Sequence, residues 1–452
     1  MDDKAKEAQE RLNELESLIS YAQKAGADAA DACFIAGSSR SAQVRLGQLE
    51  EITSNSSEDI GLRVFIGQST SSVSTSDMSQ KTLRMIAERC VAMARNAPED
   101  PWAGLAPEDR LARDFPDLDL VDSYEITPQE LETLACACED EARSHKGISN
   151  SEGAGAQIGS SVMALMTSHG FASSASATSF SLSASVIAGE GDAMQRDYAW
   201  SSSCHFADLD TAQCIGKRAA ERTLARLNPQ KIDSGIMPVI FDGRVSSSLI
   251  RHFLSAISGE AVARGTSFLR NHLHKSVFSS DIAIVEEPHR PRGLRSTAFD
   301  GEGLATGRFE VVRNGVLQSW LMDSASARQL GMEPTGHASR SLTGVDGTTV
   351  SNLIVQPGAM SRDDMISGIE RGILVTELIG MGVNTTTGDY SRGASGFLID
   401  HGAIARPVHE ITIAGNLIDM FGDMTPASDL ELRYGIDSPS LLIAKMTVAG
   451  SS

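Results

Sequence analysis

Histidines and carboxylates that lie close together in a sequence are the first candidates for metal chemistry. His272 and His274 are separated by one residue, and Glu286, Glu287 and His289 follow shortly after them. In an extended segment alternate side chains point to the same side, so two imidazoles and a nearby acid could hold one metal ion. Histidines at this spacing are also common by chance, which leaves an ordinary structural role for both as the alternative.

A further histidine, His252, lies inside residues 245–258, whose apolar spacing predicts a helix. A helical zinc site requires a second ligand one turn away on the same face. The residues four positions before and after are Ser248 and Ala256, and neither side chain binds zinc. We therefore expect a structural role for His252.

The segment from Glu377 to Gly396 concentrates glycines and hydroxyl side chains around Asp389 and Arg392. We interpret it as a loop between strands, whose free main-chain groups accept a peptide in extended form. An ordinary long hairpin loop is the alternative. The side chains that we predict to contact a substrate or a partner are Asn384, Asp389, Ser391, Arg392, Ser395 and, further along the chain, His409.

The elements that must position these residues follow from the spacing of apolar side chains. Recurrence every three or four positions predicts helices over residues 4–25, 79–97, 127–147 and 210–227. Short alternating strands are expected between the first two helices, and a Ser/Ala-rich strand region at 158–203 separates the last two. The order helix–strands–helix thus occurs twice, and we interpret it as an internal duplication.

After Pro229 the sequence changes to short strand-like runs, with helices predicted only at 245–258 and 323–330. We therefore predict an α+β fold with two domains. Residues 1–229 would form an N-terminal α+β domain of duplicated helix–strands–helix units. Residues 230–452 would form a mostly β domain with a few helices.

Composition excludes several classes of protein. The 452 residues carry 39 Lys and Arg against 59 Asp and Glu, a net charge of −20, which argues against binding nucleic acid or an anionic membrane surface. No run of about 18 apolar residues could cross a bilayer, and the charged N-terminus lacks the apolar core of a signal peptide, so we expect a cytoplasmic protein. Six cysteines, all in the first half, do not form the pattern of a disulfide framework. The excess of acids favours neutral or basic peptides as ligands.

Two segments of the C-terminal half resemble the PmbA (TldE) branch of the TldD/PmbA family. They are STAFDGEGLATGRFEVVRNGVLQSWLMDSASARQLGMEPTG (296–336) and GMGVNTTTGDYSRGASGFLIDHGAIARPVHEITIAGNL (380–417). The family consists of cytosolic bacterial and archaeal metalloproteases in which a TldD-type and a PmbA-type subunit pair and degrade unfolded or flexible peptides. It is linked to peptide maturation and, by older naming, to modulation of DNA gyrase. The resemblance implies the same class of activity, proteolysis within a heteromeric complex, for this chain.

The resemblance also implies which subunit carries the metal. In the TldD-type partner, a His-Glu-x-x-x-His helix and a cysteine near the C-terminus hold it. Those helix positions fall on Ile250, Arg251 and Ser255 here, and no cysteine follows Cys214. We therefore expect no cofactor in this chain and a zinc-type metal in a TldD-type partner, so whether this chain is itself an enzyme is left open. The alternatives are a non-enzymatic peptide-binding protein and a homodimeric peptidase with its own metal at His272 and His274.

Overall fold

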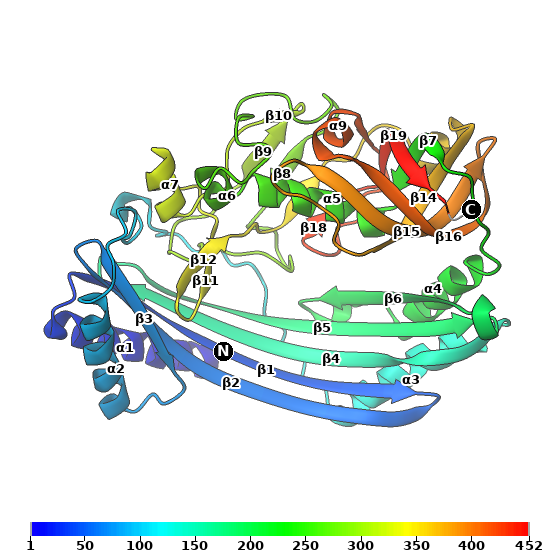
Figure 1. The fold of residues 1–452 in the computed structure, drawn as a ribbon. Coiled ribbons are helices and arrows are strands. Elements are labelled where there is room, and N and C mark those ends of the chain that lie inside the picture. The colour runs from blue at the N-terminus through cyan, green and yellow to red at the C-terminus, as the bar shows by residue number, and fades with distance from the viewer. Residues whose placement is uncertain (1, 451–452) are drawn as a thin grey trace.

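A long, curved, six-stranded antiparallel sheet forms the N-terminal half of the protein, which the computed structural model describes over residues 2–450 (Figure 1). The strands lie in the order β3-β2-β1-β4-β5-β6, so two three-stranded meanders meet where β1 pairs with β4. The strands are β1 (Ala29–Arg45), β2 (Gln48–Ile66), β3 (Ser69–Thr75), β4 (Ile148–Thr167), β5 (Ala172–Ala188) and β6 (Gln195–Ser203).

Each meander lies between two helices in the chain, which confirms the predicted duplication. Helices α1 (Asp2–Ala25) and α2 (Gln80–Ala94) flank the first meander, and α3 (Pro128–Ser144) and α4 (Ala212–Ala225) flank the second. The start of α3 is set by Thr127, whose hydroxyl accepts from the Glu130 amide while the Glu130 carboxylate accepts from the Thr127 amide. Three short 3₁₀ helices occupy Glu108–Arg110, Gly191–Ala193 and Phe206–Asp208.

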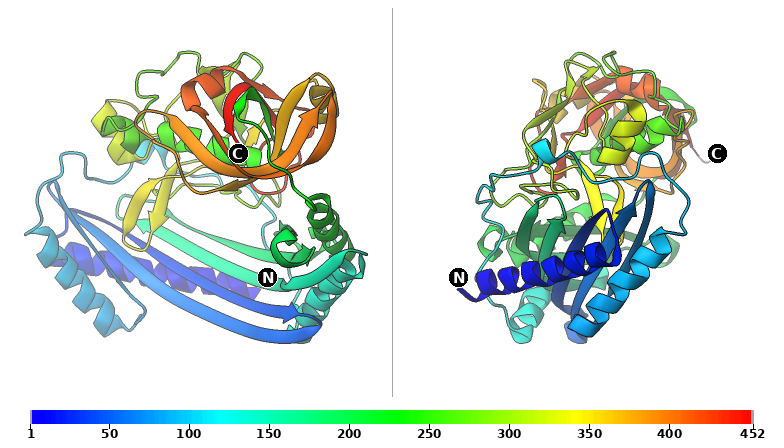
Figure 2. Two further views of the ribbon diagram at one scale, coloured as in Figure 1. Left: turned by 45° about the vertical axis from the view of Figure 1, so that its right-hand side comes forward. Right: turned by 90° about the vertical axis from the view of Figure 1, so that its left-hand side faces the viewer.

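Both helix pairs cover the same face of the long sheet. Along β1 the even-numbered Ala32 and Phe34 pack with α1 and α2, and Ala42 and Val44 pack with α3. Because strand side chains alternate, the odd-numbered Cys33 points to the opposite face, where it joins an apolar cluster with residues of the C-terminal half. The sheet is therefore a layer between the helices and the C-terminal half (Figure 2).

The C-terminal half is built around a second six-stranded sheet, in the order β16-β15-β14-β7-β19-β17. An additional pairing of β16 with β19 closes five of these strands into a ring. Strand β7, which pairs in parallel with β14, is followed directly by helix α5 (Gly243–Ala256). The apolar side of α5 packs into the core. The strands are β7 (Gly235–Phe241), β14 (Arg371–Ile379), β15 (Asp389–Asp400), β16 (Ala403–Asn416), β17 (Met424–Pro426) and β19 (Leu441–Ala449).

Smaller elements complete this half. A five-stranded sheet has the order β10-β9-β8-β13-β18, and β11 and β12 form a separate hairpin. The strands are β8 (Ile284–Glu286), β9 (Phe309–Arg313), β10 (Val316–Leu317), β11 (Ala338–Ser341), β12 (Gly344–Thr348), β13 (Leu353–Val355) and β18 (Ile436–Asp437). The helices are α6 (Gly259–Ala263), α7 (Ser324–Leu330), α8 (Arg362–Ser367) and α9 (Leu417–Gly422).

The β11–β12 hairpin joins the two halves, reaching down onto the long sheet in Figure 1. Arg340 of β11 pairs with the buried Asp31 of β1, which also pairs with its cross-strand neighbour Arg63. Gly61 lies directly under the hairpin, since a Cβ atom there would be 1.8 Å from the carbonyl oxygen of Leu342. The hairpin is therefore seated on the sheet by both charge and close packing.

The α+β fold class is confirmed by this architecture. The helices expected at 245–258 and 323–330 correspond to α5 and α7. The division after residue 229 remains a prediction; α4 ends at Ala225 and β7 begins at Gly235. No described helix is long and apolar enough to cross a lipid bilayer.

Candidate functional site

Only residues 380–388 of the predicted substrate loop lie outside a strand. Strand β14 ends at Ile379 and β15 begins at Asp389, so residues 389–396 are strand. Gly393, Ala394 and Gly396 pair with both β14 and β16, whereas residues 389–392 pair with β16 and, at Tyr390, form a bridge to Val383. The expectation of free main-chain groups was wrong at Gly393, Ala394 and Gly396, because strands on both sides already use those groups. Gly396 was predicted to be part of a loop, but it has a different role. A Cβ atom there would lie 1.9 Å from the carbonyl oxygen of Leu374, so this position requires glycine for close strand packing.

Two of the predicted contact residues organise the turn itself. The side-chain oxygen of Asn384 accepts from the amides of Thr386 (2.9 Å) and Thr387 (3.3 Å), as Asn side chains commonly do in turns. One carboxylate oxygen of Asp389 accepts from the Thr387 hydroxyl at 2.6 Å, and the other accepts from Asn416 at 3.3 Å. Both predicted residues are exposed, and their visible role is to hold the turn.

The remaining predicted residues point to different surroundings. Ser391 is exposed on β15, Ser395 is buried on the same strand, and His409 is half-buried on β16. Arg392 lies among the residues that line a cavity between the two halves of the protein. The predicted set is thus spread along two strands, and its role in substrate contact stays a prediction.

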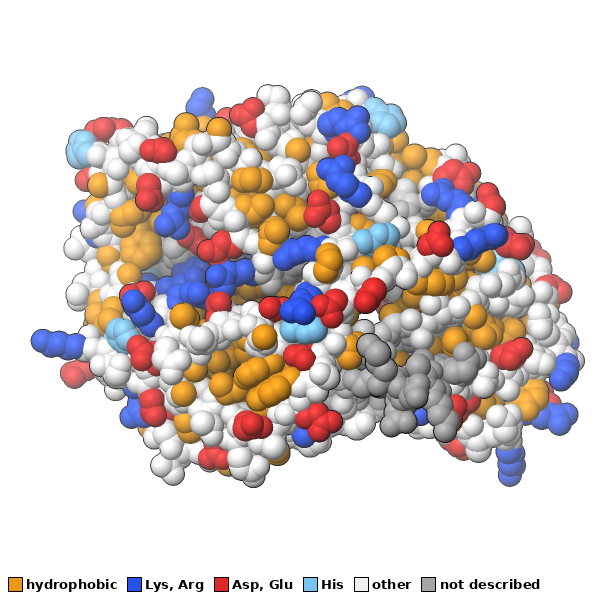
Figure 3. All heavy atoms as spheres, turned by 180° about the vertical axis from the view of Figure 1, so that it is seen from behind, with side chains coloured by type: hydrophobic (Ala, Val, Ile, Leu, Met, Phe, Trp, Pro, Cys, Tyr) orange, Lys and Arg blue, Asp and Glu red, His pale blue; other side chains and the backbone are white. Residues whose placement is uncertain are grey.

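We call the cavity at Arg392 the arginine cavity. It has a volume of about 370 Å³ and is lined by β6, the end of α4, α5, β14 and β15. Figure 3 shows Lys and Arg side chains gathered in a hollow between the upper and lower parts of the molecule. Five arginines and two carboxylates are among the residues that line the cavity. The full lining consists of Arg196, Asp197, Tyr198, Arg226, Arg244, Val245, Ser247, Ser248, Arg251, Thr376, Glu377, Leu378 and Arg392.

Asp197 is the centre of an ion-pair network on one wall of the arginine cavity. Its two oxygens pair with the two terminal nitrogens of Arg244 at 2.9 and 3.0 Å, and Arg226 lies 3.4 Å away. Arg226 also pairs with Glu377 at 2.5 Å. Burial disfavours the Asp197 carboxylate, but the hydrogen bonds and charge of Arg244 outweigh it and lower the pKa of Asp197. The network joins β6 of the long sheet to α5 and β14 of the other half.

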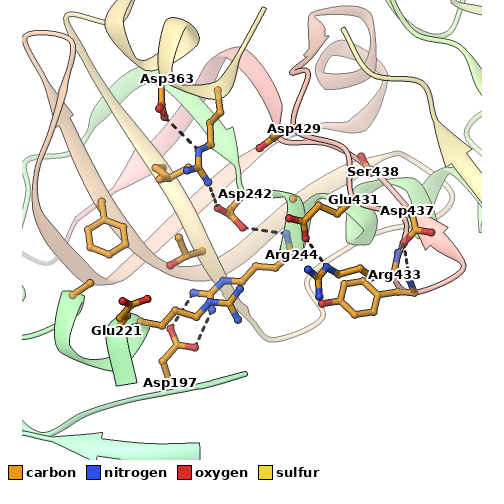
Figure 4. Close-up of a pocket in the computed structure, with 18 of the residues that line it drawn as sticks. Asp197, Glu221, Asp242, Arg244, Asp363, Asp429, Glu431, Arg433, Asp437 and Ser438 are labelled. Atoms are coloured by element: carbon orange, nitrogen blue, oxygen red, sulfur yellow. Dashed lines mark hydrogen bonds and ion pairs between the residues drawn. The ribbon is translucent and has the colours of Figure 1, made fainter. Parts of the chain in front are cut away.

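A larger cavity of about 650 Å³ adjoins the arginine cavity and shares Asp197, Arg244 and Thr376 with it (Figure 4). Acidic side chains predominate among its charged residues, but several already have partners. Asp242, which caps the start of α5, accepts from the Arg244 amide at 3.1 Å and from the Arg362 guanidinium at 3.0 Å. Its carboxylate therefore serves the fold of α5.

Helix α5 carries the three positions on which, by the sequence resemblance, we expect the metal helix of a TldD-type chain to fall. Ile250 is fully buried in the core, whereas Arg251 and Ser255 are exposed and line a cavity of about 510 Å³. The Ser255 hydroxyl donates to the Arg251 carbonyl one turn earlier. An aliphatic side chain facing the core and a cation facing the cavity do not fit a divalent metal ion.

His252 on the same helix is half-buried against Tyr390, with ring centroids 6.2 Å apart. Its Nε2 atom is buried and has no hydrogen-bond partner in the described structure. Burial, followed by the charge of Arg392, lowers the pKa of His252, so the neutral imidazole is favoured. This packing agrees with the structural role expected for it.

The alternative metal site at His272 and His274 is not formed. These residues lie in turns, and His274 has a left-handed φ of 58°, so the extended geometry that the prediction required is absent. Glu286 is buried on β8, where it pairs with Nε2 of His337 at 2.6 Å and accepts from the Ser351 amide. Among the residues that the structure describes, no three His, Cys, Asp or Glu side chains are grouped to hold a metal ion.

Three family models match successive parts of the chain. They describe PmbA/TldA metallopeptidase domain 1 (residues 30–94), the central domain (122–227) and the C-terminal domain (234–450). The chain belongs to the PmbA/TldA metallopeptidase family. It is 37% identical to Metalloprotease PmbA of Escherichia coli O157:H7, over 98% of this chain and 97% of that protein. It is also 38% identical to a Metalloprotease PmbA homolog of Haemophilus influenzae, over the same shares of each chain.

A solved structure has the same architecture over nearly the whole chain. The structure is that of a protein from Bacteroides thetaiotaomicron proposed to modulate DNA gyrase. It superposes on this chain with a TM-score of 0.90 at 29% identity, covering 97% of this chain and 98% of that one. The sequence resemblance to the family, recognised in the C-terminal half, therefore extends over both halves of the PmbA/TldA fold.

Sequence reasoning missed most of the arginine cavity. Asp197, Arg244 and Arg251 come from β6 and α5, which are distant in sequence from Arg392, and no spacing rule connects them. The signal available was local: Asp242 followed by Gly243 and Arg244 marks a helix start, which positions Arg244 in the first turn. That Arg244 would face Asp197 depends on how the two halves pack.

Proposed function

We propose that this chain is a PmbA/TldE-like subunit that pairs with a TldD-type chain in a complex cleaving unfolded or flexible peptides. The TldD-type chain would supply the metal, and this chain would form part of the surface that receives the peptide. We also propose that the complex works in the cytoplasm and that the chain, when alone, forms a homodimer.

The main support for this proposal is the type of side chain that α5 presents on its open face. A catalytic helix in a metallopeptidase needs imidazole and carboxylate side chains on its open face. Here that face presents Arg251 and Ser255, while Ile250 points into the core. The helix lies beside the cavities, and the lack of imidazole and carboxylate side chains at these positions supports a subunit that depends on a partner for the metal.

The cavities between the two halves support the peptide-binding part of the proposal. The arginine cavity and its neighbour share three lining residues and together form a polar hollow beside α5. Concave sites with a few convergent polar groups are where proteins commonly bind ligands. A flexible peptide could reach such a site, whereas a folded domain is too large to enter it.

The metal stoichiometry of the purified chain tests the proposal first. Prepared without chelators and measured by plasma mass spectrometry, the chain alone should hold close to zero zinc-type metal. Peptidase activity on an unstructured peptide should be absent with this chain alone and should appear when a TldD-type chain is added. One metal per chain, or activity without the partner, would overturn the proposed division of roles.

A non-enzymatic peptide-holding protein is the second candidate function. The open arginine-lined cavity favours it as much as it favours a protease subunit, because either would bind a peptide without cutting it. Co-purification separates the two: an affinity-tagged chain at native expression level should retain a TldD-type chain only if it is a protease subunit.

A further inference from the structure

We propose that the arginine cavity binds a carboxylate group of a peptide, either the C-terminal carboxylate or an Asp or Glu side chain. This inference rests on the proposed peptide-binding function and adds the chemical class that the cavity selects. It is carried by the charges that have no carboxylate partner, by unpaired buried donors in residues that line the cavity, and by the shape of the guanidinium group.

The cavity has an excess of positive charge that the protein itself does not neutralise. Both carboxylates in its wall are already paired with Arg226 and Arg244, and Arg196 pairs with Glu152 at 3.3 Å. Arg251 and Arg392 also line the cavity, and neither has a carboxylate within ion-pairing distance in the part of the chain that the structure describes. Two guanidinium groups thus remain available for an anion.

Polar groups beside these arginines have no partner either. The Nε atom of Arg392 and the hydroxyl oxygen of Thr376 are buried without a hydrogen bond in the described structure. Thr376 is only 8% exposed, and both residues line the cavity. Buried donors normally find acceptors, because leaving one unpaired costs free energy. An anion in the cavity would bring acceptor oxygens to the wall in which both unpaired donors lie.

A carboxylate suits these donors in geometry and in charge. A guanidinium group presents its N–H donors in a planar fork that matches the two oxygens of a carboxylate. The chain as a whole carries a net charge of −20, so a long polyanion such as a nucleic acid would be repelled outside the cavity. A peptide with one carboxylate brings a single negative charge to the place where two cations lack partners.

This local charge corrects the expectation drawn from composition. The overall excess of acids favours neutral or basic peptides only if it extends to the binding surface. In the arginine cavity five arginines face two carboxylates, both of them paired. The cavity therefore has the opposite sign to the average of the chain, and we expect it to prefer a peptide end or side chain that carries a carboxylate.

Peptide binding to the full chain tests the inference without requiring a metal or a partner. The probes are three hexapeptides of Ala, Gly, Ser and Thr labelled at the N-terminus with an uncharged fluorophore: one with a free C-terminus, one amidated, and one amidated with a single Asp. Fluorescence polarisation at low salt should show the two carboxylate-bearing peptides binding about tenfold more tightly than the neutral amide, the effect of one charge-assisted hydrogen bond. The difference between the free-acid and Asp peptides would show which source of carboxylate the cavity prefers.

Two substitutions and a control assign the effect to the cavity. R251Q and R392Q should each remove most of the difference between acid and amide, and R251Q is the safer variant because Arg251 is exposed. The matched control is R84Q, on the exposed face of α2, which should keep the full difference. Added sodium acetate should displace the acid peptide from the protein at least as well as inorganic phosphate does when the two salts supply the same concentration of negative charge.

The outcomes distinguish this inference from the function on which it rests. Equal binding of all three peptides would overturn the carboxylate site and leave peptide binding intact. No binding of any peptide would overturn both. A preference for the acid that survives R251Q and R392Q, or displacement by phosphate far more effectively than by acetate, would also overturn the assignment to this cavity.

Discussion

Arg340 and Asp31 form an ion pair that connects the two halves of the protein, with Nη2 2.5 Å from Oδ1. Both side chains are 1% exposed, and Arg63 pairs with the other oxygen of Asp31 at 2.5 Å. The two residues are separated by more than three hundred positions in the sequence, so this contact exists only when the β11–β12 hairpin is seated on the long sheet. It is therefore a sensitive point for the stability of the whole fold.

Removing one member of this pair should destabilise the protein strongly. R340M leaves Asp31 with Arg63 as its one close cation, and breaking a buried ion pair from one side typically costs about 3–5 kcal/mol. Urea denaturation should show this loss as a lower midpoint. The control is R313Q, which removes an exposed arginine and should stay within about 0.5 kcal/mol of the wild type. A normal midpoint for R340M would mean that the hairpin is held mainly by packing.

The same pair should make the protein sensitive to acid. Burial disfavours ionisation of Asp31, but the charges of Arg63 and Arg340 outweigh it and lower its pKa to about 2. Because the folded-state pKa lies below the unfolded one, the stability that Asp31 contributes is present above about pH 4 and is lost as the pH falls towards 2. Chemical denaturation between pH 5 and pH 2 should show a steeper loss for the wild type than for D31N.

Glu302 should have the opposite effect to Asp31: it should lower the stability of the protein as the pH rises towards neutral. It is buried, its carboxylate accepts from the Ser324 amide, and burial, followed by the charge of Asp300, raises its pKa to about 7. The folded state then holds a proton that the unfolded state has lost, so stability falls as the pH rises from about 4.5 to 7, by about 3 kcal/mol for this group. E302Q should remove that part of the pH dependence. An identical slope for E302Q and wild type would contradict the assignment.

Gly396 should be intolerant of a side chain. A Cβ atom would lie 1.9 Å from the Leu374 oxygen on β14, so G396A must push apart two paired strands, at a cost of about 1–3 kcal/mol or more. Gly307 is the matched control, because a methyl group there would meet no atom within 4 Å beyond its chain neighbours and its φ is not in the left-handed region. Thermal unfolding should separate G396A clearly from both G307A and wild type.

Substitutions at Asn384 and Ser391 can distinguish residues that contact the peptide from residues that hold the β14–β15 turn together. N384A removes the acceptor of two turn amides, so it should lower the melting temperature of this chain and the peptide turnover of the complex that we propose it forms with a TldD-type chain. Ser391 is exposed and its hydroxyl has no hydrogen bond in the described structure, so S391A should leave the melting temperature unchanged. If Ser391 contacts the peptide, turnover falls in S391A; unchanged turnover would remove it from the predicted set.

The local elements of this protein were predictable because local sequence decides them. The Thr127–Glu130 capping pattern marks the start of α3 within one residue, and apolar spacing identifies the four described α-helices of the N-terminal half. The repeated order of helix and strands was sufficient to predict the duplication. The prediction of a loop up to Gly396 failed because glycine is common both in loops and where strands approach closely. Only the position of the neighbouring strand distinguishes the two cases.

The sequence by itself determined the fold class, the repeated architecture, the family and the absence of metal-binding side chains at Ile250, Arg251 and Ser255, since these depend on residue types and on neighbours along the chain. Only the tertiary structure decided that Arg251 and Arg392 share a cavity, that Asp197 is already paired with Arg244, and that an acidic protein has a basic hollow between its halves. The physical reason is that charge compensation depends on distances in space. A count of charges along the sequence cannot show which arginine is left without a partner.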